Sequence, residues 1–262
     1  MIQSRLQVVA VIPAHMASVR FPGKILYELH GLPMIEHVRR RALMCDAFSD
    51  VYVATCDKEI AAVIKDFGGN VKMTSDQHRN GTSRVSEAIQ DIEATHVVLL
   101  QGDEPLLLPR HVEEFVDTIV CDPNWDAWNA TGPIEDATEL DRHSFVKCAV
   151  SQADRILYCF RRSPCYSSWD KQADFVRKIL GIIAFKKSFI SNLTSLDPSL
   201  IEEAESIEQM RMIEYGFKVR SVAVSHSLPS VNEPKEANIV LDYIENDIEQ
   251  KRLLESVLSF SV

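Results

Sequence analysis

Short apolar runs alternate with longer segments of helical period in the first half of the chain. Runs of aliphatic and β-branched residues predict buried strands at 8–13, 51–55, 71–73 and 96–101. Apolar residues spaced three and four apart predict helices from Pro33 onward and at 59–67, 83–93 and 109–120. This alternation is typical of an α/β fold, a mostly parallel sheet with helices on both faces.

The second half of the chain has a different rhythm. Strand-like runs at 146–151, 155–160 and 180–185 follow one another with turns between them, which predicts an antiparallel extension or a dimerisation flap. A helix is expected at 201–215, closed by Gly216, then a strand at 218–224 and a helix at 237–258. Because the sequence contains no repeat and no low-complexity linker, we expect one domain over 1–262 with a small antiparallel insert at about 140–200.

Composition narrows the class of protein. The 262 residues are 46% hydrophobic and 25% charged, which is typical of a soluble globular protein. No apolar run approaches the ~20 residues of a membrane span, and no signal peptide precedes the first strand, so we expect a cytoplasmic protein without a membrane partner. The net charge of −10 argues against a nucleic-acid partner. The six cysteines lack disulfide or zinc spacing, which favours free buried thiols.

A basic loop follows the first strand. Residues 1–24 contain three basic side chains and no acidic one, and Arg20 and Lys24 lie in the loop itself. In an α/β sheet, ligands bind beyond the carboxyl end of such a strand. Charge alone leaves two interpretations open, a pocket for a small polyanion such as a nucleoside triphosphate and a solvated surface loop.

Two further segments carry candidate chemistry. At the end of the strand 96–101, Gly102 permits close backbone approach and Asp103 is placed to hold Mg²⁺ against phosphate oxygens, although a simple Gly-Asp turn would read the same. In the loop 75–84, Asn80 and Gly81 predict a turn, Thr82 a helix N-cap, and Arg84 an anion or base contact. The absence of Gly-x-Gly-x-x-Gly and of Gly-x-x-x-x-Gly-Lys-Ser/Thr excludes a dinucleotide fingerprint and a P-loop.

Taken in order, these segments resemble the family of 3-deoxy-manno-octulosonate (KDO) cytidylyltransferases, also called CMP-KDO synthetases. The matching segments are Pro13–Lys24, Gly31–Val38, Val53–Asp57, Met73–Arg84, Gln101–Pro105, Glu208-Gln209-x-Arg211 and Glu214-x-Gly216. The resemblance therefore runs from about residue 6 to 245.

The resemblance implies transfer of CMP from CTP to a sugar acid such as KDO, with release of pyrophosphate, in lipopolysaccharide biosynthesis. It implies Mg²⁺ as cofactor, CTP and an acidic small molecule as partners, and a homodimer. Its catalytic residues fall on Lys24, Arg20 and Asp103, and its metal ligands on Asp103 and Asn232. Its nucleotide-binding positions fall on Ala14, His15, Ser18, Asn80, Gly81, Arg84 and Gln101, and its acceptor-binding positions on Arg161, Glu208 and Gln209.

Several positions depart from the family pattern. An arginine of the first motif is His15, which titrates near neutrality, and a metal-binding aspartate is Asn232. An acid beside Arg84 is Ser83, and a His and a Tyr on the sugar-acid side are Ile179 and Ile183. The nucleotide side is thus mostly kept and the acceptor side altered. Two alternatives stay open: a cytidylyltransferase for another ulosonic acid, a small carboxylate or a phosphonate, and a CTP-binding relative without catalysis.

Overall fold

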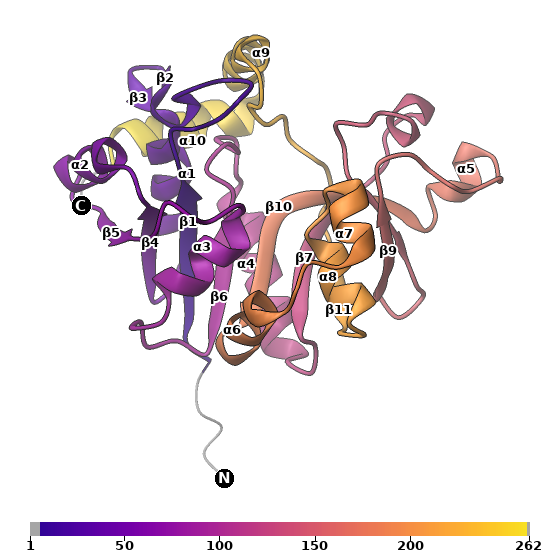
Figure 1. Cartoon of the computed structure of the whole chain (residues 1–262). Helices are drawn as coiled ribbons and strands as arrows, with labels where there is room; N and C mark the ends of the chain where they lie inside the picture. The colour runs from indigo at the N-terminus through magenta and orange to yellow at the C-terminus, as the bar shows by residue number, and fades with distance from the viewer. Residues whose placement is uncertain (1–5, 261–262) are drawn as a thin grey trace. The chain divides into compact units, whose positions relative to one another are not determined.

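The computed structural model describes residues 6–260, which form two compact units. The first unit combines residues up to Asp117 with those from Leu228 onward, and the second covers Thr118–Ser227 (Figure 1). The second unit is longer than the insert expected at about 140–200. The division into one domain with an insert stays a prediction.

A parallel sheet forms the centre of the first unit. Its strands are β1 (Val8–Ala14), β4 (Asp50–Thr55), β5 (Asn70–Met73) and β6 (His96–Leu100), in the order β6-β1-β4-β5. All seven residues of β1 are buried, because a central strand of a covered sheet has no solvent face. The four predicted strands are therefore confirmed. A short hairpin of β2 (Glu28–Leu29) and β3 (Leu32–Pro33) was not predicted.

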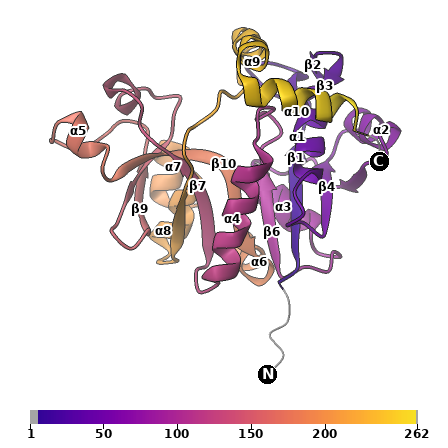
Figure 2. The ribbon, with the colours of Figure 1, turned by 180° about the vertical axis from the view of Figure 1, so that it is seen from behind.

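Helices cover both faces of this sheet, as the alternating pattern predicts. They are η1 (Lys24–Leu26), α1 (Met34–Leu43), α2 (Lys58–Asp66), α3 (Gly81–Ala88), α9 (Pro234–Asn246), α10 (Ile248–Leu258) and α4 (Pro109–Cys121), which runs past the end of the unit. Helix α3 lies in front of the sheet in Figure 1, and α4 lies in front of it in Figure 2, which shows the opposite side. The α/β class is confirmed.

Helix α1 is buried on its charged side as well as on its apolar side. Glu36 accepts hydrogen bonds from Arg39 Nε (2.5 Å) and Arg40 Nε (3.1 Å). The two arginines also donate to the carbonyls of Phe67 (3.0 Å) and Val257 (2.7 Å). Because each buried charge has an opposite charge or a carbonyl beside it, the helix tolerates burial all round. The sequence predicted only its apolar face, which is buried at Met34, Ile35, Val38 and Ala42.

The second unit contains the antiparallel strands that the sequence predicts. Strand β10 (Val176–Lys186) pairs antiparallel with β7 (Ala127–Gly132) and β8 (Lys147–Val150), and β8 pairs antiparallel with β9 (Ile156–Phe160). Strand β11 (Val219–Ala223) confirms the strand predicted at 218–224, and it runs parallel to β7. The sequence analysis did not predict β7. The helices are η2 (Ala137–Leu140), α5 (Trp169–Gln172), α6 (Lys187–Ser195), α7 (Leu200–Glu205) and α8 (Gln209–Glu214).

Three predicted helices have different bounds in the structure. The helix expected at 201–215 is divided into α7 and α8 at Ser206, whose φ is 53°. The helix expected at 237–258 is divided into α9 and α10 at Asp247, whose side chain accepts a hydrogen bond from the Gln250 amide and so starts α10. Helix α3 ends at Ala88 rather than at residue 93. A left-handed backbone at Ser206 and a side-chain cap at Asp247 thus override the continuous apolar period.

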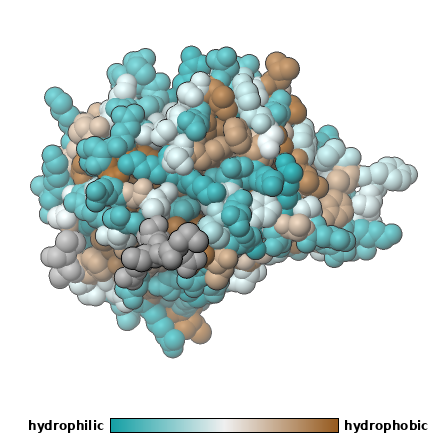
Figure 3. Space-filling model, turned by 90° about the horizontal axis from the view of Figure 1, so that it is seen from below, coloured by the Kyte–Doolittle hydropathy of each residue, from teal (hydrophilic) through white to brown (hydrophobic). Residues whose placement is uncertain are grey.

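The surface and the thiols agree with most of the compositional expectations. On the face shown in Figure 3, hydrophobic residues are dispersed among hydrophilic ones. Between residues 6 and 260, no helix has the length and apolar character needed to cross a membrane. All six cysteines are free, as expected, but only Cys45, Cys148 and Cys159 are buried, whereas Cys56 and Cys165 are half-buried and Cys121 is exposed.

Candidate functional site

A pocket of about 740 Å³ opens at the carboxyl ends of β1, β4 and β6 in the first unit. The chain passes from β1 to β4 on one side and later to β6 on the other, so the strand order reverses beside β1, where α/β sheets bind ligands. Its volume is that of a typical small-molecule site. Of the predicted site residues, it is lined by Ala14, His15, Ser18, Arg20, Lys24, Asn80, Gly81, Arg84, Gln101, Asp103 and Asn232.

The basic loop after β1 is folded back on itself. The carbonyl of Met16 accepts hydrogen bonds from the amides of Ser18 (2.9 Å) and Gly23 (3.0 Å), and the Met16 amide donates to Asp57 Oδ2 (2.9 Å). Gly23 has a φ of 72°, a conformation that side-chain-bearing residues adopt only at a cost. These contacts fix a turn that lines the pocket, which favours the ligand interpretation of the loop over a solvated one.

Lys24 forms an ion pair with Asp103 at the centre of the pocket. Its Nζ donates to Asp103 Oδ2 (2.5 Å) and to the carbonyl of Val231 (3.0 Å), and the two side chains are 12% and 21% exposed. The Val231 amide in turn donates to the Asp103 carbonyl (2.9 Å). Because the Val231 side chain is fully buried, this carbonyl is a fixed acceptor. Lys24 is thus held by one fixed carbonyl and by a carboxylate whose place a phosphate group could take.

Arg20 lies at the same end of the pocket with a weaker, neutral partner. Its Nη2 donates to Asn232 Oδ1 (3.2 Å), and the arginine is exposed. The Asn232 amide nitrogen of the backbone donates to Glu236 (2.6 Å), which forms the N-terminal capping box of α9. The neutral amide oxygen leaves the guanidinium charge available to an anion.

Two glycines allow the strand ends to meet closely. A Cβ atom on Gly102 would lie 3.2 Å from Ile25 Cδ1 and 3.5 Å from the carbonyl oxygen of Pro13. A Cβ atom on Gly81 would lie 3.1 Å from Pro13 Cγ. The close approach predicted for Gly102 is therefore confirmed, and Gly81 brings the start of α3 against the end of β1.

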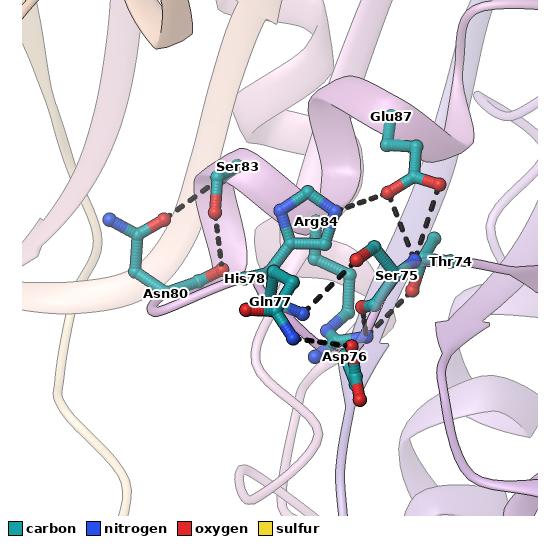
Figure 4. Close-up of polar contacts among 9 residues, drawn as sticks. All are labelled: Thr74, Ser75, Asp76, Gln77, His78, Asn80, Ser83, Arg84 and Glu87. Atoms are coloured by element: carbon teal, nitrogen blue, oxygen red, sulfur yellow. Dashed lines mark hydrogen bonds and ion pairs between the residues drawn. The ribbon is translucent and has the colours of Figure 1, made fainter.

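The loop 75–80 and the start of α3 form another wall of the pocket (Figure 4). Asn80 Oδ1 accepts the Ser83 amide (2.9 Å), so the N-cap of α3 is Asn80 and the prediction of Thr82 was wrong. The helix begins at Gly81, which places Thr82 inside its first turn. Arg84 is 4% exposed, and its Nη1 donates to Thr74 Oγ1 (2.6 Å) and to the Ser75 carbonyl (3.2 Å).

His15 titrates lower than the sequence suggested. Partial burial of the ring lowers its pKa below the ordinary 6.5, and the positive charges of Arg84 and Lys24 lower it further, while Asp57 and Asp103 oppose them. The imidazole is consequently neutral at pH 7 before any anion enters the pocket. An anion would have to pull a proton onto the ring to gain a charge there.

The donor set fits a magnesium ion held mainly by a ligand. Across residues 6–260, no three His, Cys, Asp or Glu side chains are grouped to hold a metal. Mg²⁺ usually takes one or two protein carboxylates and completes its octahedron with phosphates and water. Asp103 supplies one such carboxylate at the pocket, whereas the Asn232 oxygen already accepts from Arg20. The metal roles of both residues stay predictions.

The predicted acceptor residues belong to the second unit. The Arg161 guanidinium donates to the carbonyls of Glu205 (2.8 Å), His143 (3.0 Å) and Ser206 (3.0 Å). Buried Gln209 donates to Asn129 Oδ1 (3.0 Å), and Glu208 lies at the start of α8. Arg161 and Gln209 therefore have structural partners inside their own unit, and an acceptor role for the three residues stays a prediction.

Several pocket residues were missed by the sequence analysis. Asp57 follows β4 as Asp103 follows β6, so the rule that selected Asp103 could have found it. Asp76, His78 and Arg79 also line the pocket, in a loop whose conformation no local pattern predicts.

Comparisons with known proteins agree with this geometry. Residues 9–221 match a family described as cytidylyltransferase. The chain is 34% identical over 248 residues to the 3-deoxy-manno-octulosonate cytidylyltransferase of Geobacter metallireducens, which covers 90% of this chain and 97% of that protein. It is 35% identical over 240 residues to the 8-amino-3,8-dideoxy-manno-octulosonate cytidylyltransferase of Shewanella pealeana, covering 89% and 97%. Among solved structures, CMP:2-keto-3-deoxy-manno-octonic acid synthetase complexed with CTP superposes with a TM-score of 0.86 at 34% identity, covering 91% of this chain and 98% of that one.

Proposed function

Because this chain belongs to the cytidylyltransferase family, we propose that it transfers CMP from CTP to an octulosonate sugar acid and releases pyrophosphate. The observation that carries the proposal is the Lys24–Asp103 pair beside Arg20, at the switch point of the sheet, in a pocket of nucleotide size. The CTP complex of a similar solved structure supports the choice of nucleotide.

The reaction exchanges a phosphoanhydride bond of CTP for a phosphodiester bond to the acceptor. An acceptor hydroxyl attacks the α-phosphorus of CTP, a new P–O bond forms, and the bond to the bridging oxygen of the β-phosphate breaks. The hydroxyl proton leaves to solvent, and pyrophosphate departs with the electron pair. Catalysis of such a displacement consists mainly of alignment and neutralisation of charge.

Lys24 and Arg20 supply the neutralising charges. On binding, Lys24 exchanges the carboxylate of Asp103 for phosphate oxygens, and Arg20 exchanges the amide oxygen of Asn232. Asp103 is then free to act as the protein ligand of Mg²⁺. When bound, Mg²⁺ draws negative charge from the phosphate oxygens and orients them.

The remaining wall of the pocket binds the nucleoside. Asn80, Gly81, Arg84 and Gln101 line the side formed by α3 and the end of β6, away from the basic loop in the chain. Side-chain amides and a guanidinium can match the carbonyl and amine groups of cytosine. We assign them to the base and the ribose.

The acceptor class comes from the relatives named above. Both relatives carry the names of 3-deoxy-manno-octulosonate acids, one with an amino group at carbon 8. On β10, the apolar residues Ile179 and Ile183 stand at positions where the family has His and Tyr on the sugar-acid side. We therefore expect a modified octulosonate to be used at least as well as KDO itself.

Pyrophosphate release tests the proposal directly. The purified protein is given CTP, Mg²⁺ and, in turn, KDO, its 8-amino analogue, another ulosonic acid and small carboxylates or phosphonates. Release that requires CTP and one of the octulosonates supports the proposal. CTP binding without release with any acid would instead identify a binding protein, and release with a small phosphonate would overturn the sugar-acid assignment.

Two further assignments follow from the same family. We propose a cytoplasmic homodimer. The second unit has exposed large apolar side chains at Leu157, Tyr166 and Trp169, and these can pack in a subunit contact. Light scattering of the pure protein gives the mass, and a monomer at micromolar concentration would refute the dimer.

A further inference from the structure

The loop 75–80 is held to α3 by two side chains on one face of the helix. Arg84 and Glu87 are three residues apart, so they lie next to each other on the helix surface, and Figure 4 shows both directed at the loop. Arg84 lines the pocket, whereas Glu87 does not. Glu87 therefore influences the pocket through the loop residues that it contacts and through its charge near Arg84.

Glu87 and Arg84 together bind both backbone polar groups of Ser75. The Ser75 amide donates to both carboxylate oxygens of Glu87, at 3.2 Å and 3.1 Å, and its carbonyl accepts from Arg84 Nη1 at 3.2 Å. Arg84 also binds Thr74 Oγ1. With both sides of one residue bonded to the helix, the entry of the loop has a fixed direction.

Glu87 also bonds to the middle of the loop. Its Oε2 forms a hydrogen bond with His78 Nε2, and this bond is the main reason that the pKa of Glu87 lies below its ordinary value. An ionised carboxylate is a stronger acceptor than a neutral one. Inside the loop, Gln77 bonds to Ser75 (3.1 Å) and to Asp76 (2.8 Å), and these contacts move with the loop. The end of the loop is held separately, because Asn80 Oδ1 accepts the Ser83 amide (2.9 Å).

We infer that Glu87 is a positioning residue for the nucleotide: by binding Ser75 and His78 together, it holds the loop 75–80 in the conformation that completes the pocket wall. The inference rests on the proposed function, since it assigns that wall to CTP. It predicts an effect on CTP affinity alone, because the reacting phosphates and the acid are bound by other residues.

Kinetics of Glu87→Ala and Glu87→Gln test the inference against the matched control Glu93→Ala. Glu93 is an exposed acid shortly after α3 that does not line the pocket. If the competent loop conformation falls to a tenth of the population, the apparent affinity falls about 10-fold. We expect the KM for CTP to rise about 10-fold in Glu87→Ala, less in Glu87→Gln and not in Glu93→Ala. The kcat at saturating CTP and the KM for the acid should stay within twofold of wild type.

Hydrogen–deuterium exchange gives a readout that a general loss of stability would not reproduce. Peptides covering 74–80 should exchange faster in Glu87→Ala while those covering β1 and β6 stay unchanged. If Glu87→Ala does not fold, Glu87→Gln carries the same prediction with a smaller effect.

The outcomes separate this inference from the function on which it rests. A wild-type protein that does not bind CTP would overturn both. Wild-type CTP binding with an unchanged KM in the Glu87 variants would overturn the positioning role alone. A uniform loss of kcat and of both affinities, with faster exchange throughout the first unit, would also overturn it, because Glu87 would then be a general stabilising residue.

Discussion

Replacing Lys24 and Asp103 singly and together would separate their structural role from their role in the reaction. Lys24→Met keeps the aliphatic stem and removes the charge, and Asp103→Asn keeps the shape and removes the opposite charge. Each single variant leaves one charge in a partly buried place, where the partner side chains are 12% and 21% exposed. The double variant leaves neither.

The expected magnitudes follow from this geometry. Leaving a fully buried charge unpaired costs about 3–5 kcal/mol, and the remaining water access here reduces that to about 2 kcal/mol for each single variant. The double variant should cost about 2 kcal/mol rather than the sum, which is a coupling energy of about 2 kcal/mol, within the range for residues in contact. Activity should behave differently. Each single variant should lose about 10²-fold or more in rate, and the double variant should not recover any of it.

Urea denaturation gives the free energy of unfolding, and pyrophosphate release gives the rate, on the same four proteins. Additive changes in unfolding free energy would show that the ion pair is not formed in solution. A single variant with a near-wild-type rate would show that the reaction takes place elsewhere, and a double variant that regained the rate would show that the pair only stabilises the fold.

Three shorter tests address the nucleotide, His15 and the helix break. In a thermal-shift comparison of the four triphosphates with Mg²⁺, CTP should stabilise the protein most, and equal stabilisation by ATP would refute the assignment of Asn80, Arg84 and Gln101 to cytosine. Because the pKa of His15 is lowered below 6.5 in the free protein and a bound triphosphate raises it, CTP affinity should fall as pH rises between the pKa of the free protein and that of the complex. His15→Arg should tighten binding at pH 8 and flatten that dependence in a CTP titration, and identical profiles would place His15 away from the phosphates. Ser206→Gly should raise the free energy of unfolding by about 0.5–1 kcal/mol in urea, since it relieves a left-handed backbone, and a loss would show that the serine side chain makes stronger native contacts.

The sequence predicted the first unit well because its elements are strongly periodic. Burial of apolar residues is enough to predict the strand at 8–13 and the helix after Pro33, and the structure has both as β1 and α1. Helix ends were less predictable. Ser206 interrupts a regular apolar period with neither Gly nor Pro, and the Glu202–Arg211 ion pair joins the two halves across the break (2.6 Å), so tertiary contacts decide its place. The burial of Glu36 could not be predicted either. Its arginine partners are close in the sequence, but the groups that cover them, such as the Val257 carbonyl, belong to distant elements that meet α1 only in the folded chain.

The candidate site was predictable where it follows the ends of strands. Asp103 stands just beyond β6, and Arg20 and Lys24 lie in the loop that follows β1, so the parallel sheet brings these positions together. Asn232 could be placed only through the family resemblance, because it comes from a distant segment. Glu87 lay outside any motif considered, since its function depends on a loop conformation that the sequence does not display.

The chain order of the first unit has a consequence for the synthesis of the protein. Leu29 and Met34 share a core cluster with Val231 and Ala237, which follow the whole second unit in the sequence. Translation at about 5–20 residues per second separates the two groups by roughly 10–40 s. During that interval the Lys24 side chain has no Val231 carbonyl to bind. The apolar side chains of Leu29 and Met34 also lack the residues of α9 that pack on them in the folded protein. Until the final segment is synthesised the pocket lacks Asn232, so a chain that ends before it cannot form the complete pocket.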